Sequence, residues 1–267
     1  MRDKLNIALP AALIVTAEAF FFNGGTEECL EVHLLNIFLC VILAIFRPKG
    51  SDLLVAFVLI SLLRVLNVGM PTFFDLSIYF FPFIYLPVII AAYLLWRADN
   101  IDEGKRPSIG DIWKFMNGVS ASEVPTFKLI FIPLATLIAL FMAFFEYAVL
   151  RPDALVPDMS LASITALLVV MVFFVGFGEE LVFRTILQTR AQERMGAVGA
   201  VVFSALMFSV MHSGYGSLLY LAYVFIVGLV LGVSYLRTRN LIFIALIHGL
   251  INFFLFSFLP KGWFLFD

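Results

Sequence analysis

Charged residues are scarce in this chain, because only 13% of its 267 residues are Asp, Glu, Lys or Arg. Soluble domains are about 25% charged and about half apolar, whereas this chain is 63% hydrophobic with a mean hydropathy of +1.05. The composition excludes a soluble globular protein and predicts a polytopic protein embedded in the lipid bilayer. Its apolar runs approach the length of about 20 residues that a helix needs to cross a bilayer, and they lack the strict alternation of barrel strands.

Cysteine and histidine are also scarce, which limits the chemistry that the chain can carry. Cys29 and Cys40 are too few for a disulfide framework or a zinc knuckle, and they leave the redox compartment open. The only histidines are His33, His212 and His248. Lys and Arg are scattered among the predicted loops, so a nucleic-acid-binding patch is excluded.

The apolar segments predict an all-α transmembrane helical bundle of about eight or nine spans. The first segment is longer than the core of a secretory signal, so we expect it to be retained as a span. A long polar segment, 96–128, divides the chain into an N-terminal four-span half, 1–128, and a C-terminal half, 129–267. The candidate spans are residues 5–22, 32–46, 53–69, 77–95, 129–150, 161–185, 197–212, 217–236 and 241–259.

Basic residues alternate between successive predicted loops. Arg2 and Lys4 precede the first span, and further Lys and Arg follow the second, fourth, sixth and eighth spans. The alternate loops 23–31, 70–76 and 213–216 contain none. Under the positive-inside rule this pattern predicts a cytoplasmic N-terminus, and in a prokaryotic cell the membrane is then the plasma membrane.

An ionisable side chain inside a span is costly unless it is paired or hydrated, so each one marks a candidate functional position. The stretch VGFGEELVFR, 175–184, places Glu179, Glu180 and Arg184 in an apolar helix. Glu180 and Arg184 are four residues apart and share a helix face, which predicts an ion pair between them. Glu179 is rotated by about 100° from Glu180 and is the carboxylate left for chemistry.

Two later apolar segments carry polar side chains at helical spacing. Phe208 lies four residues before His212, and His248 lies four residues before Asn252. A carboxylate with an imidazole can deprotonate water, and an imidazole with an amide can donate hydrogen bonds to an oxyanion. One acid, two imidazoles and one amide therefore suffice for amide hydrolysis without a Ser or Cys nucleophile.

The three motifs, in this order, resemble those of the CPBP family, which comprises the CAAX proteases and bacteriocin-processing enzymes. They are E-E-x-x-x-R at 179–184, F-x-x-x-H at 208–212 and H-x-x-x-N at 248–252, so the resemblance covers roughly 161–255. It implies that the C-terminal half is a CPBP-type catalytic bundle. Family members include the type II CAAX prenyl endopeptidases, maturation proteases for small peptides, and immunity or scaffold proteins.

The resemblance implies an intramembrane glutamate-type endopeptidase and assigns roles to the site residues. Glu179 and His212 would activate a water, and His248 with Asn252 would form the oxyanion hole. The substrate would be a membrane-associated protein or peptide, lipidated or not, cleaved near the cytoplasmic leaflet. The supporting residues would be Glu180, Arg184 and Phe208.

Three other interpretations stay open. Glu179 and the two late histidines would make an acceptable zinc set, although H-E-x-x-H is missing, and we predict neither a metal nor another cofactor. A non-catalytic scaffold or immunity protein would keep the motif as a buried polar network. A transporter also places Glu, Arg and His inside the membrane, but the two halves show no inverted repeat.

Two expectations concern the surroundings of the motifs. Arg64 lies in the middle of a span and needs a counter-charge, for which Glu18 is a candidate. For Glu179 to lie near the middle of the membrane, we expect its helix to continue through 185–194.

Overall fold

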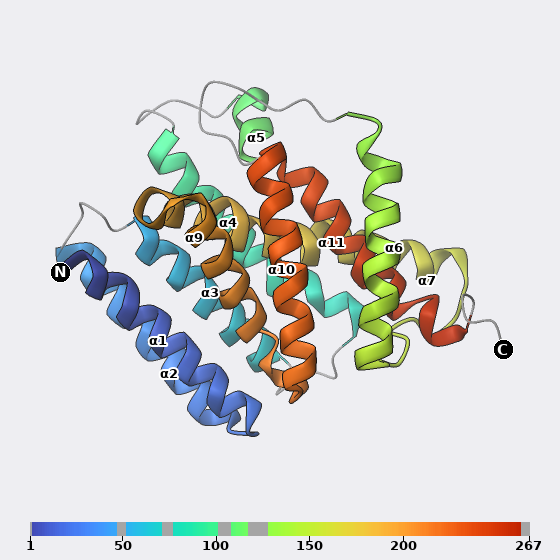
Figure 1. The fold of residues 1–267 in the computed structure, drawn as a ribbon, viewed down its shortest axis with the longest axis horizontal. Coiled ribbons are helices and arrows are strands. Elements are labelled where there is room, and N and C mark those ends of the chain that lie inside the picture. The colour runs from blue at the N-terminus through green and yellow to red at the C-terminus, as the bar shows by residue number, and fades with distance from the viewer. Residues whose placement is uncertain (1, 47–51, 71–76, 101–107, 117–127, 263–267) are drawn as a thin grey trace. The chain divides into compact units, whose positions relative to one another are not determined.

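The computed structural model describes residues 2–46, 52–70, 77–100, 108–116 and 128–262, which form helices joined by loops (Figure 1). No strand occurs among these residues, so the all-α prediction is confirmed. Two compact units interleave along the chain, Met1–Leu76 with Val182–Gly232 and Ser77–Leu181 with Val233–Asp267. The division into sequential halves at residue 128 stays a prediction.

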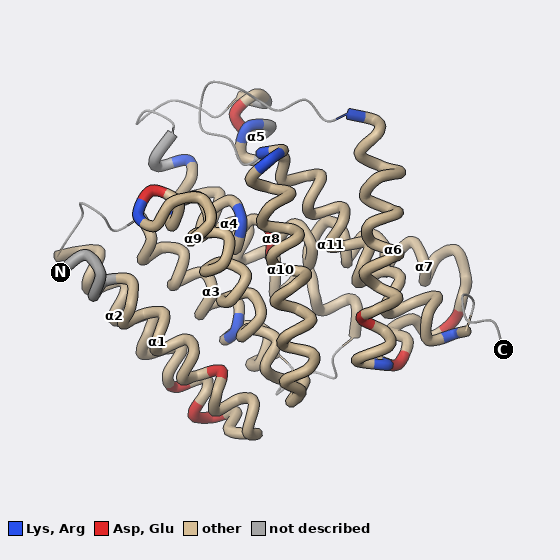
Figure 2. Tube along the Cα trace, viewed as in Figure 1, with Lys and Arg blue, Asp and Glu red and all other residues tan. Residues whose placement is uncertain are grey.

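The first unit brings the N-terminal helices together with the region around His212. Its helices α1 and α2 lie side by side and are joined by a tight turn in which Gly24 takes a φ of +86°. Figure 2 shows acidic residues at this turn, where their negative charges stabilise the positive end of the α2 helix dipole. The elements are α1 (Arg2–Phe22), α2 (Thr26–Phe46), α3 (Asp52–Gly69), η4 (Leu181–Gln188), α9 (Thr189–Val210), η5 (Ser213–Tyr215) and most of α10 (Leu218–Thr238).

The second unit is built around α11, of whose 16 residues 11 are buried. Helix α11 packs against α6 and against the π-helical stretch η3. The elements are η2 (Ile78–Phe80), α4 (Phe81–Asn100), α5 (Ile109–Met116), α6 (Phe131–Leu150), α7 (Leu161–Val169), η3 (Val170–Gly176), α8 (Phe177–Glu180), α11 (Leu241–Phe256) and η6 (Leu259–Lys261).

The start of α7 is fixed by a cap outside the apolar segment. The Ser160 side chain accepts a hydrogen bond from the backbone N–H of Ser163, as an N-cap residue does. Asp158 accepts hydrogen bonds from Ser160 and Ser163, which hold the pKa of this carboxyl below its usual range. These contacts set the point from which the helix of the glutamate motif begins.

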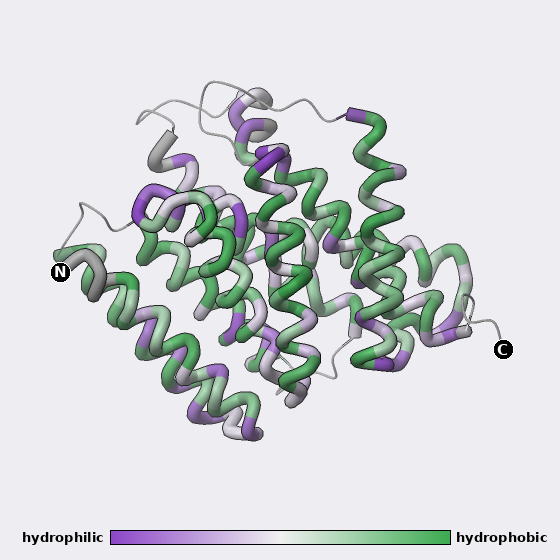
Figure 3. The backbone as a smooth tube through the Cα atoms, viewed as in Figure 1, coloured by the Kyte–Doolittle hydropathy of each residue, from purple (hydrophilic) through white to green (hydrophobic). Residues whose placement is uncertain are grey.

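Among the residues that the structure describes, six helical stretches are long and apolar enough to cross a membrane, and two shorter apolar helices, Ile7–Phe22 and Leu53–Gly69, accompany them. Figure 3 shows that apolar residues run along most of the length of these helices. The chain is therefore an integral membrane protein with a transmembrane helical bundle. Residues 101–107 and 117–127 of the predicted polar segment, together with residues 47–51 and 71–76, lie outside the described residues.

The predicted sixth and seventh spans belong to one stretch, Leu161–Val210, of 50 residues. The helix continues through 185–194, as expected, and breaks at Gly196, whose φ of 73° and ψ of 174° are not helical. Glycine accepts this conformation without the steric cost that a side chain brings. The boundary that the sequence placed between two spans is therefore a kink.

Candidate active site

The two glutamates of the first motif lie on a single α-helical turn between two π-helical stretches. Helix α8 has four residues, with η3 before it and η4 after it. Glu179 is 9% exposed and Glu180 is fully buried. π-Helix is rare and is frequently found at functional sites. The apolar pattern of the sequence did not predict these stretches.

His248 lies beside both carboxylates. Its Nδ1 is 2.9 Å from Oε1 of Glu180, and its Nε2 is 3.9 Å from Oε2 of Glu179. When Nδ1–H donates to Glu180, the ring is held in one orientation and its Nε2 faces Glu179. The contact between Glu180 and His248 joins α8 to α11 and was not predicted from the sequence.

Tyr85 is a site residue that the sequence analysis missed. It lies on α4 and is 2% exposed, and its hydroxyl donates a hydrogen bond to Oε1 of Glu179 at 2.5 Å. A buried carboxylate needs such donors because it has lost its water. The available signal was a phenol between Pro82 and Pro87 in an otherwise apolar segment.

Glycines let these elements approach until their backbones touch. A Cβ added at Gly249 would lie 2.5 Å from Cα of Val172, and one at Gly176 would lie 2.7 Å from the carbonyl oxygen of Ala245. Helix α11 therefore contacts η3 closely, and this contact holds His248 near Glu180. Small residues serve the same purpose at many helix crossings in membranes.

The second motif lies in the first unit, where His212 follows the end of α9 and is partly buried. Its Nδ1 is 2.9 Å from the backbone oxygen of Phe208, and the two rings lie 4.8 Å apart between centroids. Because a backbone carbonyl only accepts, Nδ1 carries the proton of the neutral ring and Nε2 carries the lone pair. That tautomer is the one a base acting through Nε2 requires.

Arg184 supports Phe208 in the same unit. Its Nη1 donates to Oγ of Ser204 at 2.9 Å, and its guanidinium carbon lies 4.8 Å from the centroid of the Phe208 ring. Phe208 is thus fixed between a buried cation and His212. The ion pair between Glu180 and Arg184 stays a prediction.

The structure brings the predicted residues together in two groups. Asn252 lies one turn after His248 on α11, in the unit that also holds both glutamates. The remaining group, in the other unit, is Arg184, Phe208 and His212. The joint action of Glu179 and His212 on a water stays a prediction.

Metal-ligating side chains gather at one place in the N-terminal helices. In the described part of the chain, one group of at least three side chains of metal-ligating type has its ligand atoms within 4.8 Å of one another. It consists of Glu18, Cys29 and His33, and none of the three belongs to a motif.

Comparison with known proteins gives one match. The family model described as "Type II CAAX prenyl endopeptidase Rce1-like" matches residues 161–254, about a third of the chain. This range contains all three motifs and supports the family assignment made from them for this part of the chain. Tyr85 and the helices α1 to α4 lie outside it. No curated protein and no solved structure is similar enough to the chain to match it.

Proposed function

We propose that this chain, whose residues 161–254 carry the domain of the CPBP and type II CAAX prenyl endopeptidase family, is an intramembrane endopeptidase of the glutamate type. The observation that carries the proposal is the position of His248, whose two ring nitrogens face Glu180 and Glu179. A buried imidazole between two carboxylates, with a phenol on one of them, is an arrangement suited to proton transfer.

In the proposed reaction Glu179 is the general base. It takes a proton from a water, and the water oxygen forms a bond to the carbonyl carbon of the scissile peptide. His212 acts with Glu179 on this water through the lone pair on its Nε2, the role that the family resemblance gives it. The proton held by Glu179 then passes to the leaving nitrogen as the carbon–nitrogen bond breaks.

The oxyanion formed by this attack needs hydrogen-bond donors, and we assign them to His248 and Asn252. With both ring nitrogens protonated, His248 donates Nδ1–H to Glu180 and presents Nε2–H to the developing charge. The two neighbouring carboxylates compensate the positive ring. Asn252 adds an amide donor from the same helix, one turn away.

The proposed substrate is the C-terminal tail of a membrane-associated protein or peptide. The name of the matched family points to a C-a-a-X tail in which the cysteine carries a prenyl group. A prenyl chain would hold the scissile bond at the membrane surface. The positive-inside pattern predicts a cytoplasmic N-terminus, and we propose that cleavage occurs near the cytoplasmic leaflet.

The test compares cells that express wild type with cells that express Glu179→Gln at matched membrane levels. Mass spectrometry of protein termini is expected to find C-termini of membrane-anchored proteins that appear only with wild type. Such termini would identify the substrate as well as the reaction. Identical termini in the two populations would contradict the proposal and favour the non-catalytic scaffold.

Tyr85→Phe is expected to lower kcat by about tenfold or more, because a hydrogen bond to a charged group contributes about 1.5–3 kcal/mol. The ring remains, so packing around Glu179 is preserved. The measurement uses purified protein in nanodiscs and a quenched fluorescent peptide with a farnesylated C-a-a-X tail, called the reporter below.

Tyr93→Phe is the matched control, because it removes a phenol hydroxyl from the same helix. The Tyr93 ring packs against Trp96 and Phe115, at 6.3 Å and 5.2 Å between centroids. We expect its kcat to equal that of wild type. Equal kcat values for the two variants would show that the hydroxyl of Tyr85 does not assist Glu179.

A further inference from the structure

A buried ion pair lies outside the matched family domain, between Glu18 of α1 and Arg64 of α3. Arg64 donates from Nε to Oε1 of Glu18 at 2.7 Å and from Nη2 to Oε2 at 2.8 Å. Glu18 is 2% exposed and Arg64 is 6% exposed. The counter-charge predicted for Arg64 is thus confirmed, and the two-pronged geometry is the strongest that an arginine and a carboxylate form.

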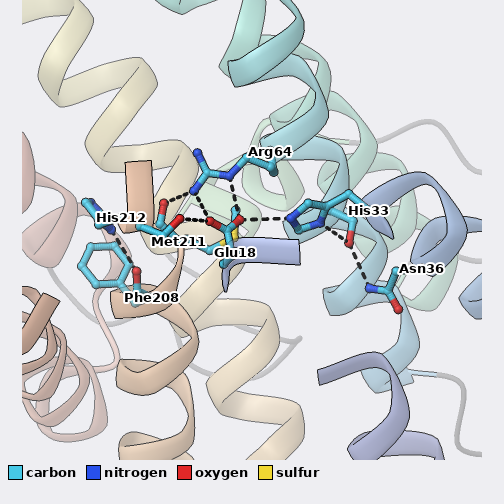
Figure 4. A network of polar contacts seen from close by, with 9 residues as sticks. Glu18, His33, Asn36, Arg64, Phe208, Met211 and His212 are labelled. Carbon is cyan, nitrogen blue, oxygen red and sulfur yellow. Dashed lines mark hydrogen bonds and ion pairs between the residues drawn. The ribbon is translucent and has the colours of Figure 1, made fainter. Parts of the chain in front are cut away.

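This ion pair also binds the residues immediately before and after His212. Nη2 of Arg64 donates to the backbone oxygen of Met211 (Figure 4). The hydroxyl of Ser213 donates to Oε2 of Glu18 at 2.5 Å. All these groups belong to the first unit. One ion pair therefore holds the turn that carries His212 from both sides.

Close packing reinforces the same turn. A Cβ added at Gly214 would clash with the ring of Phe21, so α1 lies directly against the turn. The guanidinium of Arg64 lies over that same ring, 4.8 Å from its centroid. The backbone of His212, with φ −100° and ψ 14°, leaves the helix at this point.

We propose that Glu18 and Arg64 are positioning residues for His212. They act through Met211 and Ser213 and keep the His212 backbone where its Nδ1–H donates to Phe208, so that Nε2 stays the basic nitrogen. The inference rests on the proposed function, in which His212 acts on the water. It gives α1 and α3, which carry no family motif, a task in the reaction.

A metal site at Glu18, Cys29 and His33 is the competing interpretation of the same cluster. Their ligand atoms lie within 4.8 Å of one another. However, both oxygens of Glu18 already accept hydrogen bonds from Arg64, and a guanidinium at 2.7 Å opposes a second cation. The contacts favour an ion-pair network over a metal centre.

The network also extends away from His212, and this part supplies a matched control. His33 lies 3.0 Å from Glu18 through Nε2 and 3.1 Å from Oγ of Ser61 through Nδ1, and Asn36 donates to the same Ser61 oxygen at 2.9 Å. Ser61 and Ser213 are both buried serines of one network. Only Ser213 adjoins His212.

The test compares Ser213→Ala with Ser61→Ala by side-chain nitrogen NMR of protein labelled at histidine. The chain has three histidines, so three ring signals are expected, and single His→Asn substitutions assign them. In wild type, His212 is expected to show the Nδ1–H tautomer. In Ser213→Ala its signal is expected to become a mixture of tautomers, whereas Ser61→Ala should change the His33 signal alone.

Kinetics with the reporter supply the second readout. Ser213→Ala is expected to lower kcat by about tenfold with KM unchanged, because a displaced catalytic group costs rate rather than binding. Ser61→Ala should keep the kcat of wild type. A purely structural role would instead lower the melting temperature of both variants equally and leave the His212 tautomer intact.

An unchanged His212 signal in Ser213→Ala would overturn the positioning proposal, whatever the activity. If wild type does not cleave the reporter or any cellular protein, the proposed function fails, while the ring signals still decide whether Glu18 and Arg64 position His212. Zinc added to wild type gives a further check. A shift of the His33 signal at equimolar zinc would support the metal site and contradict the ion-pair interpretation.

Discussion

Glu179→Gln is expected to lower kcat for the reporter by about a thousandfold, within the range of about 10²–10⁴ that a general base contributes. The glutamine side chain has nearly the same shape, and its amide oxygen can still accept the hydrogen bond from Tyr85. It cannot take a proton from water. The melting temperature of the protein in nanodiscs is therefore expected to stay close to that of wild type.

Glu180→Gln is the matched control, because it removes the neighbouring carboxylate from the same helical turn. Its loss should weaken the orientation of His248, whose Nδ1 lies 2.9 Å away, and lower kcat by about 10–100-fold, as for groups that orient a site residue. Glu180→Gln must therefore be the milder of the two variants. If it lowers kcat more than Glu179→Gln does, Glu180 is the base and our assignment is wrong.

Residue spacing along the sequence predicted what lies on each helix but not which helices cross. The four-residue spacing placed His248 and Asn252 on one helix, and both lie on α11. It also placed Phe208 and His212 on one helix, but His212 follows the end of α9, with its Nδ1 still 2.9 Å from the backbone oxygen of Phe208. The same rule paired Glu180 with Arg184. That ion pair stays a prediction. The structure adds a contact of Glu180 with His248 on α11, which periodicity within one helix cannot predict.

The pairing of Glu18 with Arg64 was predictable because a buried guanidinium requires an anion and few acids lie inside spans. The bonds from this pair to Met211 and Ser213 were not predictable. The bond between Glu18 and Ser213 joins positions nearly 200 residues apart in the sequence. Both bonds depend on how α1 packs against η5. Sequence separation of this size carries no spacing signal.

The π-helical stretches around α8 could not be predicted from the sequence either, because their apolar residues fit an α-helical pattern equally well. Tyr85 was missed for a related reason. A phenol in an apolar span is usually an interfacial or packing residue. Only its 2.5 Å contact with Glu179 identifies it as part of the site.

Gly249→Ala is expected to disrupt the second unit and to reduce kcat at least a hundredfold. The added methyl would lie 2.5 Å from Cα of Val172 and 2.7 Å from the carbonyl oxygen of Met171. Both are backbone atoms, so no rotamer change relieves the clash, and α11 must move away from η3. Overpacking of this kind costs about 1–3 kcal/mol, which corresponds to a fall of about 5 °C in melting temperature.

The same displacement explains why activity should fall further than stability. His248 precedes Gly249, and a shift of α11 by about 1 Å would lengthen its 2.9 Å contact with Glu180, a misplacement that costs about 100-fold in rate. Gly69→Ala is the control, because no atom of the described residues lies within 4 Å of a Cβ at that position. Its melting temperature and kcat should match those of wild type.

Combining Gly249→Ala with Gly176→Ala separates a helix displacement from two local defects. Gly176 faces Ala245 and Gly249 across the same contact, with a Cβ at Gly176 lying 2.8 Å from the Gly249 nitrogen. If the first substitution already moves α11 away, the second should cost much less than it does alone, because both act through one displacement. Additive losses of melting temperature would mean that the helices keep their distance and absorb each methyl locally, and the contact between Glu180 and His248 would then not depend on these glycines.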